Sequence, residues 1–214
     1  KNNPNQFIWQ SNRDGWNHLY LYDINGNLIK QLTKGSWEVT EAKGFDPMST
    51  KIFFVNTASS PVDKTLSYVD LKSGKVFPVV STPGIHTTQV SFDGTSFIDS
   101  YSTISIPRKI QVLNLRSLSS KEKKKSGGKE IQVDEKTILE ASNPLKEYKP
   151  VDISLFTIKN NAGDSLYCRL FKSPDVNDGK KHPLVVYWYG GPHAQMITNS
   201  WNGGAGDYWF RYMA

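Results

Sequence analysis

The sequence predicts a mainly β chain, organised for most of its length as a partial β-propeller of about three four-stranded antiparallel blades. Three observations predict this fold class. Apolar and polar residues alternate over short runs, which is the period of a strand with one buried face. Turn dipeptides separate these runs at close intervals. Aromatic residues make up 12% of the 214 residues, and aromatic side chains favour pleated surfaces.

The strand-like runs follow one another through the first half of the chain. They cover residues 7–10, 18–23, 28–32, 51–55, 66–70, 76–80, 88–92, 96–99 and 109–113. Asn25-Gly26 lies between two of these runs and is the strongest short-range signal for a β-hairpin. Ser73-Gly74 and Asp93-Gly94 separate later runs in the same way. The pattern therefore predicts antiparallel strands joined by tight turns.

An internal repeat favours a propeller over other all-β folds. The run 19–23 with its turn at 25–26 parallels the run 66–70 with its turn at 73–74. This spacing matches the ~40–50-residue period of propeller blades. A β-sandwich also has evenly spaced short strands and is the alternative. Sandwiches rarely repeat an aromatic-Asp-turn unit at this interval, so the propeller is preferred.

The composition changes between residues 116 and 150, and we place a domain boundary within this stretch. A Ser/Lys-rich stretch gives way to a segment compatible with a helix over 134–141, and then to prolines typical of a linker. We assign residues 1–143 to the propeller blades and residues 144–214 to the start of a second, incomplete domain. In that second part, 152–159 and 165–172 are predicted to form a hairpin.

The segment after this hairpin carries the clearest chemical signal. Residues 184–188 (Leu-Val-Val-Tyr-Trp) are predicted to form a buried strand that stops at Gly190-Gly191-Pro192. Tyr189, the last residue before the glycines, is placed to direct its phenol at a developing negative charge. The alternative interpretation is that Gly-Gly-Pro merely ends the strand, as it does in many folds, and has no role in catalysis. Further on, a helix is predicted to begin at Asp207, in the N-cap role.

The run Tyr-Gly-Gly-Pro-His-Ala-Gln at 189–195, followed by Thr198-Asn199-Ser200-Trp201, resembles the opening of the catalytic domain in the prolyl oligopeptidase clan. Its bacterial dipeptidyl peptidase IV branch is the nearest match, and residues 11–20 and 32–39 resemble late propeller blades of that branch. In that interpretation Trp16 and Trp37 are expected to be apolar anchors between neighbouring blades. The resemblance implies that an α/β-hydrolase domain begins near residue 144. It also implies that Tyr189 donates a hydrogen bond to the oxyanion.

The same resemblance implies a serine exopeptidase that releases N-terminal dipeptides with Pro or Ala in the second position. The chain contains no G-x-S-x-G nucleophile motif. We therefore expect the serine, aspartate and histidine of the triad to lie beyond Ala214. Residues 1–214 alone are expected to be inactive. Acylaminoacyl and tripeptidyl peptidases of the clan share the Gly-Gly-Pro loop, so these two branches remain alternative assignments. A non-catalytic propeller module for interactions or scaffolding is the alternative of a different class.

Composition limits the other function classes. The net charge of +6 comes largely from a lysine-rich run at 121–129, which is expected to be a solvated loop without the aromatics of a nucleic-acid site. The single cysteine, Cys168, is expected to be a buried or half-buried side chain, and a single cysteine excludes an internal disulfide. The four histidines are scattered, so we expect no metal and no cofactor. His193 is not a credible general base.

Location and assembly are expected from the family alone. No apolar run is long enough for a membrane helix, and no signal peptide is present at residue 1. The resemblance implies a periplasmic, secreted or cell-surface enzyme acting on peptides with a free N-terminus, without nucleic acid. We expect the intact enzyme to be a homodimer. Because three blades cannot close a ring, the piece alone is expected either to self-associate through its exposed blade edges or to adopt a compact packing that is not a ring.

Overall fold

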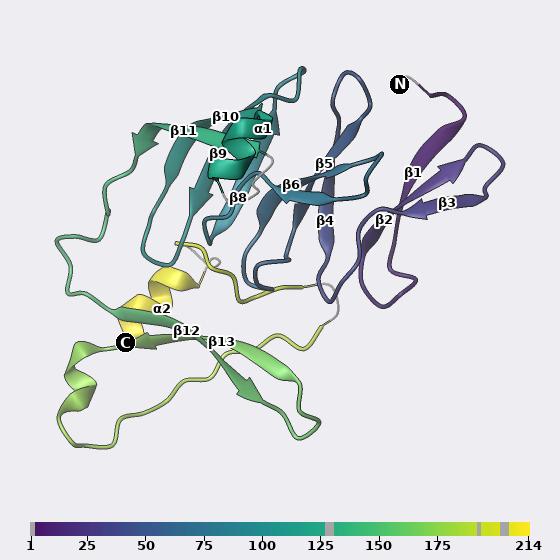
Figure 1. The fold of residues 1–214 in the computed structure, drawn as a ribbon. Helices are drawn as coiled ribbons and strands as arrows, with labels where there is room; N and C mark the ends of the chain where they lie inside the picture. The colour runs from purple at the N-terminus through teal and green to yellow at the C-terminus, as the bar shows by residue number, and fades with distance from the viewer. Residues whose placement is uncertain (1–2, 127–130, 192–193, 202–205) are drawn as a thin grey trace.

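The computed structural model describes residues 3–126, 131–191, 194–201 and 206–214 (Figure 1). Strands predominate. They are β1 (Gln6–Ser11), β2 (His18–Asp23), β3 (Leu28–Gln31), β4 (Val39–Phe45), β5 (Lys51–Asn56), β6 (Thr65–Asp70), β7 (Val76–Pro78), β8 (Ile85–Val90), β9 (Ser96–Ser102), β10 (Lys109–Ser117), β11 (Ile131–Glu140), β12 (Asp152–Lys159) and β13 (Ser165–Lys172). The helices are α1 (Ser120–Lys125), the 3-10 helix η1 (Pro174–Asn177) and α2 (Asp207–Met213).

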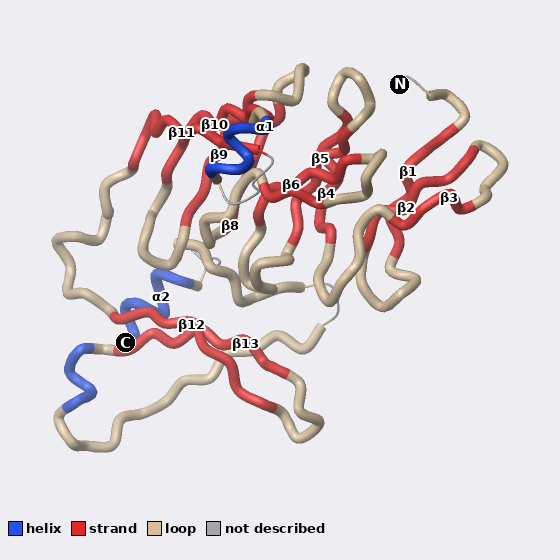
Figure 2. Tube along the Cα trace, viewed as in Figure 1, coloured by secondary structure: helices blue, strands red, loops and turns tan. Residues whose placement is uncertain are grey.

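Three antiparallel sheets follow one another along the chain and confirm the predicted blades, although the first has three strands among the described residues rather than the predicted four. Blade 1 has the order β1-β2-β3, blade 2 the order β4-β5-β6-β7, and blade 3 the order β11-β10-β9-β8. Each blade is a meander of sequential strands, and the three sheets stand side by side in Figures 1 and 2. The predicted hairpin also forms, as the separate two-stranded sheet β12-β13, which lies below the blades in the same views.

Blade 2 is buried on both faces, because a blade stands on either side of it. Successive residues of a strand point to opposite faces, and β5 uses both. Ile52 and Phe54 pack with residues of blade 1, whereas Phe53 and Val55 pack with Phe97 and other residues of blade 3. A strand with two buried faces reads as a continuous apolar run rather than an alternating one, as 52–55 does.

Trp37 fills the gap between blades 1 and 2, as predicted. It lies in the connection from β3 to β4, stacks on Phe54 with ring centroids 6.2 Å apart, and meets His18 edge-on at 4.9 Å. Such contacts add to the area that a large ring buries. Trp16 differs, since it is 39% exposed and belongs to neither buried cluster. The prediction of an anchor between blades therefore holds for Trp37 alone.

The internal repeat has a physical cause in the turns. Asp23 and Asp70 end equivalent strands, β2 and β6, and each carboxylate accepts hydrogen bonds from backbone N–H groups of the turn that follows. Asp46 does the same after β4, where its Oδ1 accepts from the N–H groups of Thr50 and Lys51 at 2.7 Å. Aspartate recurs at blade intervals because its short carboxylate can satisfy turn donors.

Asp93, in the turn after β8, offers a test of this arrangement. The Ser91 hydroxyl and the Thr95 backbone N–H donate to its carboxylate, and these bonds lower its pKa from 3.8 to about 2. Because the folded pKa is the lower one, the stabilisation is complete above pH 3.8 and is lost as the pH falls through about 2. We expect Ser91→Ala to move the NMR titration midpoint of Asp93 toward 3.8 and to leave that of Asp70 unchanged. An unmoved Asp93 midpoint would contradict the assignment.

Two predictions between residues 116 and 143 are wrong. The described part of the lysine-rich run, residues 121–126, contains no buried residue, but residues 120–125 form α1 rather than a loop. The segment 134–141, predicted to be compatible with a helix, instead belongs largely to β11, which pairs with the whole of β10. Tertiary pairing decides here, since β11 completes the fourth strand of blade 3 and covers part of its apolar face with Ile131 and Val133.

The predicted buried strand at 184–188 is also wrong. These residues have no strand assignment, and Leu184, Val186 and Trp188 are 77%, 63% and 76% exposed. A strand needs neighbours for its backbone groups and cover for its side chains. The described residues supply neither, because β12 and β13 pair only with each other. The described part of 144–214 therefore contains no parallel sheet.

The helix predicted at Asp207 is confirmed, although Asp207 does not cap it. Gly206 is the N-cap residue, and Asp207 is the first residue of α2. Its carboxylate instead binds Arg169 and Arg211. Within the described residues, no helix combines the length and the apolarity needed to cross a membrane.

Candidate functional site

Tyr189 lies in an extended, partly exposed segment and its ring turns toward the following glycines. The residue is 57% exposed. A Cβ atom added at Gly191 would lie 2.6 Å from the Tyr189 hydroxyl oxygen, so the phenol occupies the space that any other side chain at position 191 would need. A larger side chain at 191 would therefore push the Tyr189 ring out of its present place. No hydrogen bond joins the Tyr189 hydroxyl to a described residue, which leaves that donor open.

The segment before Tyr189 is held by an aromatic cluster on α2. Tyr187 contacts Phe210 with ring centroids 5.6 Å apart, and Phe210 in turn stacks on Phe171 of β13 at 5.5 Å. Trp209 meets Phe210 edge-on at 5.2 Å. Tyr187 is two residues before Tyr189, so this cluster helps to fix where the candidate oxyanion donor lies.

A buried ion cluster fixes α2 against β13. Arg169 Nη2 lies 3.1 Å from Asp207 Oδ1, and Arg211 Nε lies 2.8 Å from Asp207 Oδ2. The Arg169 and Asp207 side chains are only 4% and 3% exposed, and both arginines donate to the carbonyl oxygen of Trp201. Burial lowers the pKa of Arg169, which the Asp207 charge partly offsets. This cluster could not be predicted from the sequence, since nothing in the spacing of 169 and 207 indicates contact.

A His/Asp pair inside blade 3 has the wrong surroundings for catalysis. His86 Nδ1 lies 2.9 Å from Asp99 Oδ2, and both side chains are fully buried. His86 Nε2 faces the carbonyl oxygen of Thr82 at 3.0 Å. Both ring nitrogens thus face oxygen acceptors, and neither is available to take a proton from a nucleophile. The pair joins the strands of the blade, with Gln111 donating to Asp99.

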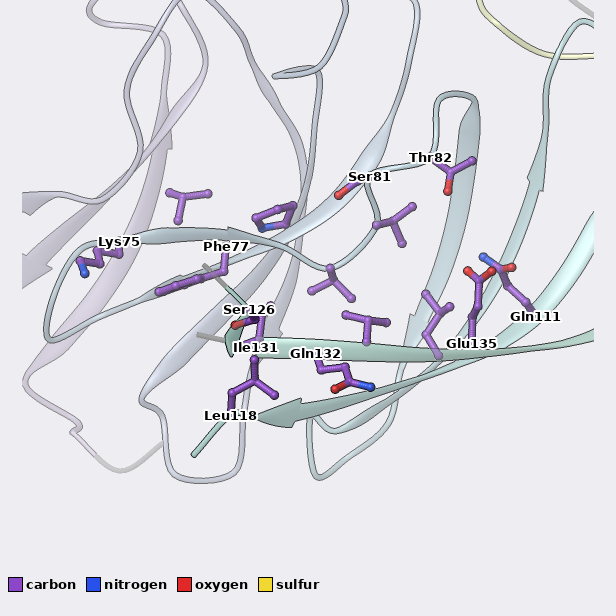
Figure 3. Close-up of a pocket in the computed structure, with 16 residues that line it drawn as sticks. Lys75, Phe77, Ser81, Thr82, Gln111, Leu118, Ser126, Ile131, Gln132 and Glu135 are labelled. Carbon is purple, nitrogen blue, oxygen red and sulfur yellow. The ribbon is translucent and has the colours of Figure 1, made fainter. Parts of the chain in front are cut away.

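A groove lies elsewhere, between the outer strands of blades 2 and 3 (Figure 3). Its cavity volume is about 870 Å³, and Phe77, Leu113 and Ile131 give it an apolar lining. Lys75 and Glu135 are the charged residues among those that line it. No residue of 184–201 contributes. The groove is therefore a gap between blade edges and is separate from the Tyr189 site.

Other residues considered for chemistry do not assemble with Tyr189. Cys168 is free and half-buried on β13, as expected. His193 and Pro192 lie outside the described residues. No group of three or more His, Cys, Asp or Glu side chains that could hold a metal ion occurs among the described residues. The candidate site consequently rests on Tyr189 and the Gly190-Gly191 backbone.

Comparison with known proteins decides the family. Residues 1–108 match the family model described as the dipeptidyl peptidase IV N-terminal region. The chain belongs to the dipeptidyl peptidase IV family. This confirms the relationship inferred from the motifs at 11–20 and 32–39, which lie in the matched region, and it agrees with the propeller-like blades.

Curated relatives extend the likeness over almost the whole chain. Dipeptidyl peptidase 4 of Trichophyton equinum is 30% identical over 203 residues, which cover 94% of this chain and 25% of that protein. The protein of the same name from Arthroderma otae is 31% identical over 202 residues, with the same coverage. The chain thus spans about a quarter of the length of these relatives.

Solved structures show the same architecture. A putative dipeptidyl aminopeptidase IV from Bacteroides ovatus matches with a TM-score of 0.78 and 30% identity, over 98% of this chain and 31% of that one. Dipeptidyl peptidase 4 of Porphyromonas gingivalis matches with a TM-score of 0.72 over 97% of this chain and 28% of its own. At 24% identity, the second match speaks for the fold alone.

Proposed function

We propose that this chain is part of a serine exopeptidase that releases dipeptides from the N-termini of peptides, with Pro or Ala in the second position. Its family membership supports peptide hydrolysis, and the names of its relatives support the dipeptidyl specificity. Residues 1–143 would supply propeller blades, and residues 144–214 would begin an α/β-hydrolase domain. Further parts of the protein would supply the serine, aspartate and histidine, so this stretch alone would be inactive.

The observation that carries the proposal is the position of the Tyr189 phenol. Acyl transfer builds negative charge on the carbonyl oxygen of the scissile bond, and a fixed hydrogen-bond donor at that point lowers the barrier. Tyr189 has a partly exposed ring and a hydroxyl without a described partner, and a Cβ atom at the neighbouring Gly190 would meet open space. These features suit an oxyanion donor, and the triad would supply the attacking oxygen.

The substrate class can be tested on the full-length protein with chromogenic dipeptide amides. We expect rapid release from Gly-Pro and Ala-Ala derivatives that carry a free amino group, and little release from the same compounds after N-acetylation. A serine-directed phosphonate should abolish the activity. Equal hydrolysis of acetylated compounds would contradict an exopeptidase that needs a free N-terminus. No hydrolysis of any peptide amide would favour a non-catalytic propeller module.

The proposal extends to location and assembly as the family resemblance implies. We propose that the intact enzyme is exported, to the periplasm, the cell surface or the medium, and that it acts as a homodimer on peptides with a free N-terminus. Cell fractionation and light scattering on the full-length protein test these two points separately.

A further inference from the structure

The segment that follows the candidate oxyanion loop is fastened to two blades at once. Asn199 makes three hydrogen bonds across this junction. Its backbone N–H donates to the carbonyl of Val62 at 2.8 Å, and its Nδ2 donates to Asp63 Oδ1 at 2.9 Å, both in the β5–β6 loop of blade 2. Its Oδ1 accepts from the N–H of Ile104, in the β9–β10 loop of blade 3, at 3.2 Å.

The acceptor on blade 2 is fixed independently of Asn199. Asp63 is only 6% exposed, and its Oδ1 also accepts from the N–H of Gly84 at 2.8 Å. Lys64 exchanges backbone hydrogen bonds with Gly84 and His86, which joins blade 2 to blade 3 at this level. A Cβ at Gly84 would lie 2.7 Å from the carbonyl oxygen of Ser102, so the joint is tightly packed. Asn199 therefore binds a rigid junction.

Two more contacts hold the same segment on either side of Asn199. Gln195 Nε2 donates to the carbonyl of Pro61, and the N–H of Trp201 donates to the Ser102 hydroxyl at 3.4 Å. In Figure 1 this segment runs below the lower ends of blades 2 and 3. Gln195 follows Tyr189 by six residues, and a chain spans at most ~3.3–3.6 Å per residue. The anchored segment thus limits how far Tyr189 can move from the blades.

We propose that Asn199 is a positioning residue of the enzyme. It locks segment 195–201 onto the joint between blades 2 and 3 and so limits how far Tyr189 can move from the propeller. The proposal rests on the proposed function, because it acts through Tyr189. An amide suits this place, since one side chain must donate to a buried carboxylate and accept from a backbone N–H. Aspartate at 199 would face the Asp63 carboxylate. Alanine would remove the acceptor of the Ile104 N–H and one of the two donors to Asp63 Oδ1, which would keep only the Gly84 N–H.

The test compares Asn199→Ala and Asn199→Asp in the full-length enzyme with the matched control Asn114→Ala. Asn114 is an exposed residue of β10 whose side-chain oxygen accepts a hydrogen bond from the Ser96 hydroxyl. Rates are expressed per active serine, titrated with a phosphonate probe. We expect a roughly tenfold to hundredfold fall in kcat per active serine for both Asn199 variants, since a misplacement of about 1 Å can cost that much. KM should change less, and the control should behave as wild type.

A purely structural role gives a different result. It would lower the number of titratable sites while each remaining site kept the wild-type kcat, and that outcome would overturn the proposal. Hydrogen exchange supplies a readout besides activity. We expect faster exchange over residues 184–191 in Asn199→Ala, with blade 1 unchanged, and equal exchange there would also overturn the proposal.

A double-mutant cycle separates this inference from the proposed function. If Asn199 acts through Tyr189, Asn199→Ala should cost much less activity in a Tyr189→Phe background than in wild type. Additive losses would show that Asn199 does not work through Tyr189. If kcat per active serine falls in Tyr189→Phe but stays at the wild-type value in Asn199→Ala, the positioning role is overturned and the oxyanion assignment remains. A normal Tyr189→Phe would defeat the oxyanion assignment first, and the positioning role with it.

Discussion

Tyr189→Phe in the full-length enzyme is expected to lower kcat by about 10²- to 10³-fold, the range found when one oxyanion donor is removed. The substitution deletes a single hydroxyl and keeps the ring that packs over Gly191. The hydrogen bond it removes forms only as charge develops on the substrate, so KM should stay close to wild type. Steady-state kinetics on a Pro-containing chromogenic dipeptide amide measure both quantities.

The control for this change is Tyr208→Phe. Tyr208 is on α2 and is 50% exposed, close to the 57% of Tyr189, so the two substitutions remove the same group from similarly exposed places. Tyr208→Phe should leave kcat unchanged. A Tyr189→Phe enzyme with wild-type turnover, or one that loses titratable serine in step with its activity, would refute the role of the phenol in the transition state.

Much of the blade architecture could be predicted because local signals and tertiary contacts agree. The hairpin at Asn25-Gly26 and the apolar run of β5 need no distant information. β4 escaped prediction for a physical reason, since its sequence is polar, contains Gly44 and pairs with β5 through two register irregularities. Irregular pairing breaks the strict alternation on which strand prediction relies.

The helix α1 carried a signal that was overlooked. Ser119 and Glu122 stand three residues apart, the spacing of a capping box, and in the structure the Ser119 N–H donates to Glu122 Oε2 at 2.9 Å. The surrounding lysines concealed this start signal, because a run of like charge usually indicates an unstructured loop. The capping box is a local signal, and it predicts the start of this helix even within a run of like charge.

In the candidate site, too, local features could be predicted from the sequence, whereas contacts between distant residues could not. Tyr189 and its glycines could be proposed from sequence, because a chain turn and an aromatic residue are local features. The strand expected at 184–188 could not form among the described residues, since apolarity specifies burial but does not supply the neighbours that bury it. Asn199 and Arg169 were beyond sequence reasoning, because their partners at positions 63 and 207 are distant along the chain.

Asp207→Asn is expected to have the largest effect on local stability. The substitution keeps the shape of the side chain and removes the negative charge that Arg169 and Arg211 share. Arg169 has no second anion to turn to, since its Nε and Nη1 atoms lack hydrogen-bond partners in the described part of the chain. Removing one partner of a buried ion pair typically costs about 3–5 kcal/mol. The opening free energy of β12–β13, measured by hydrogen exchange in the full-length protein, should fall by this order.

The matched control is Asp175→Asn, which removes the same charge from an exposed pair with Lys149, whose side chains are 69% and 62% exposed. Exposed pairs contribute about 0–1 kcal/mol, so this variant should exchange like wild type. The Asp207 variant should also speed exchange at 184–189, because Phe210 of α2 holds Tyr187. Equal exchange in the two variants would mean that aromatic packing alone keeps α2 on β13, and that the ion cluster is dispensable for holding the Tyr189 segment in place.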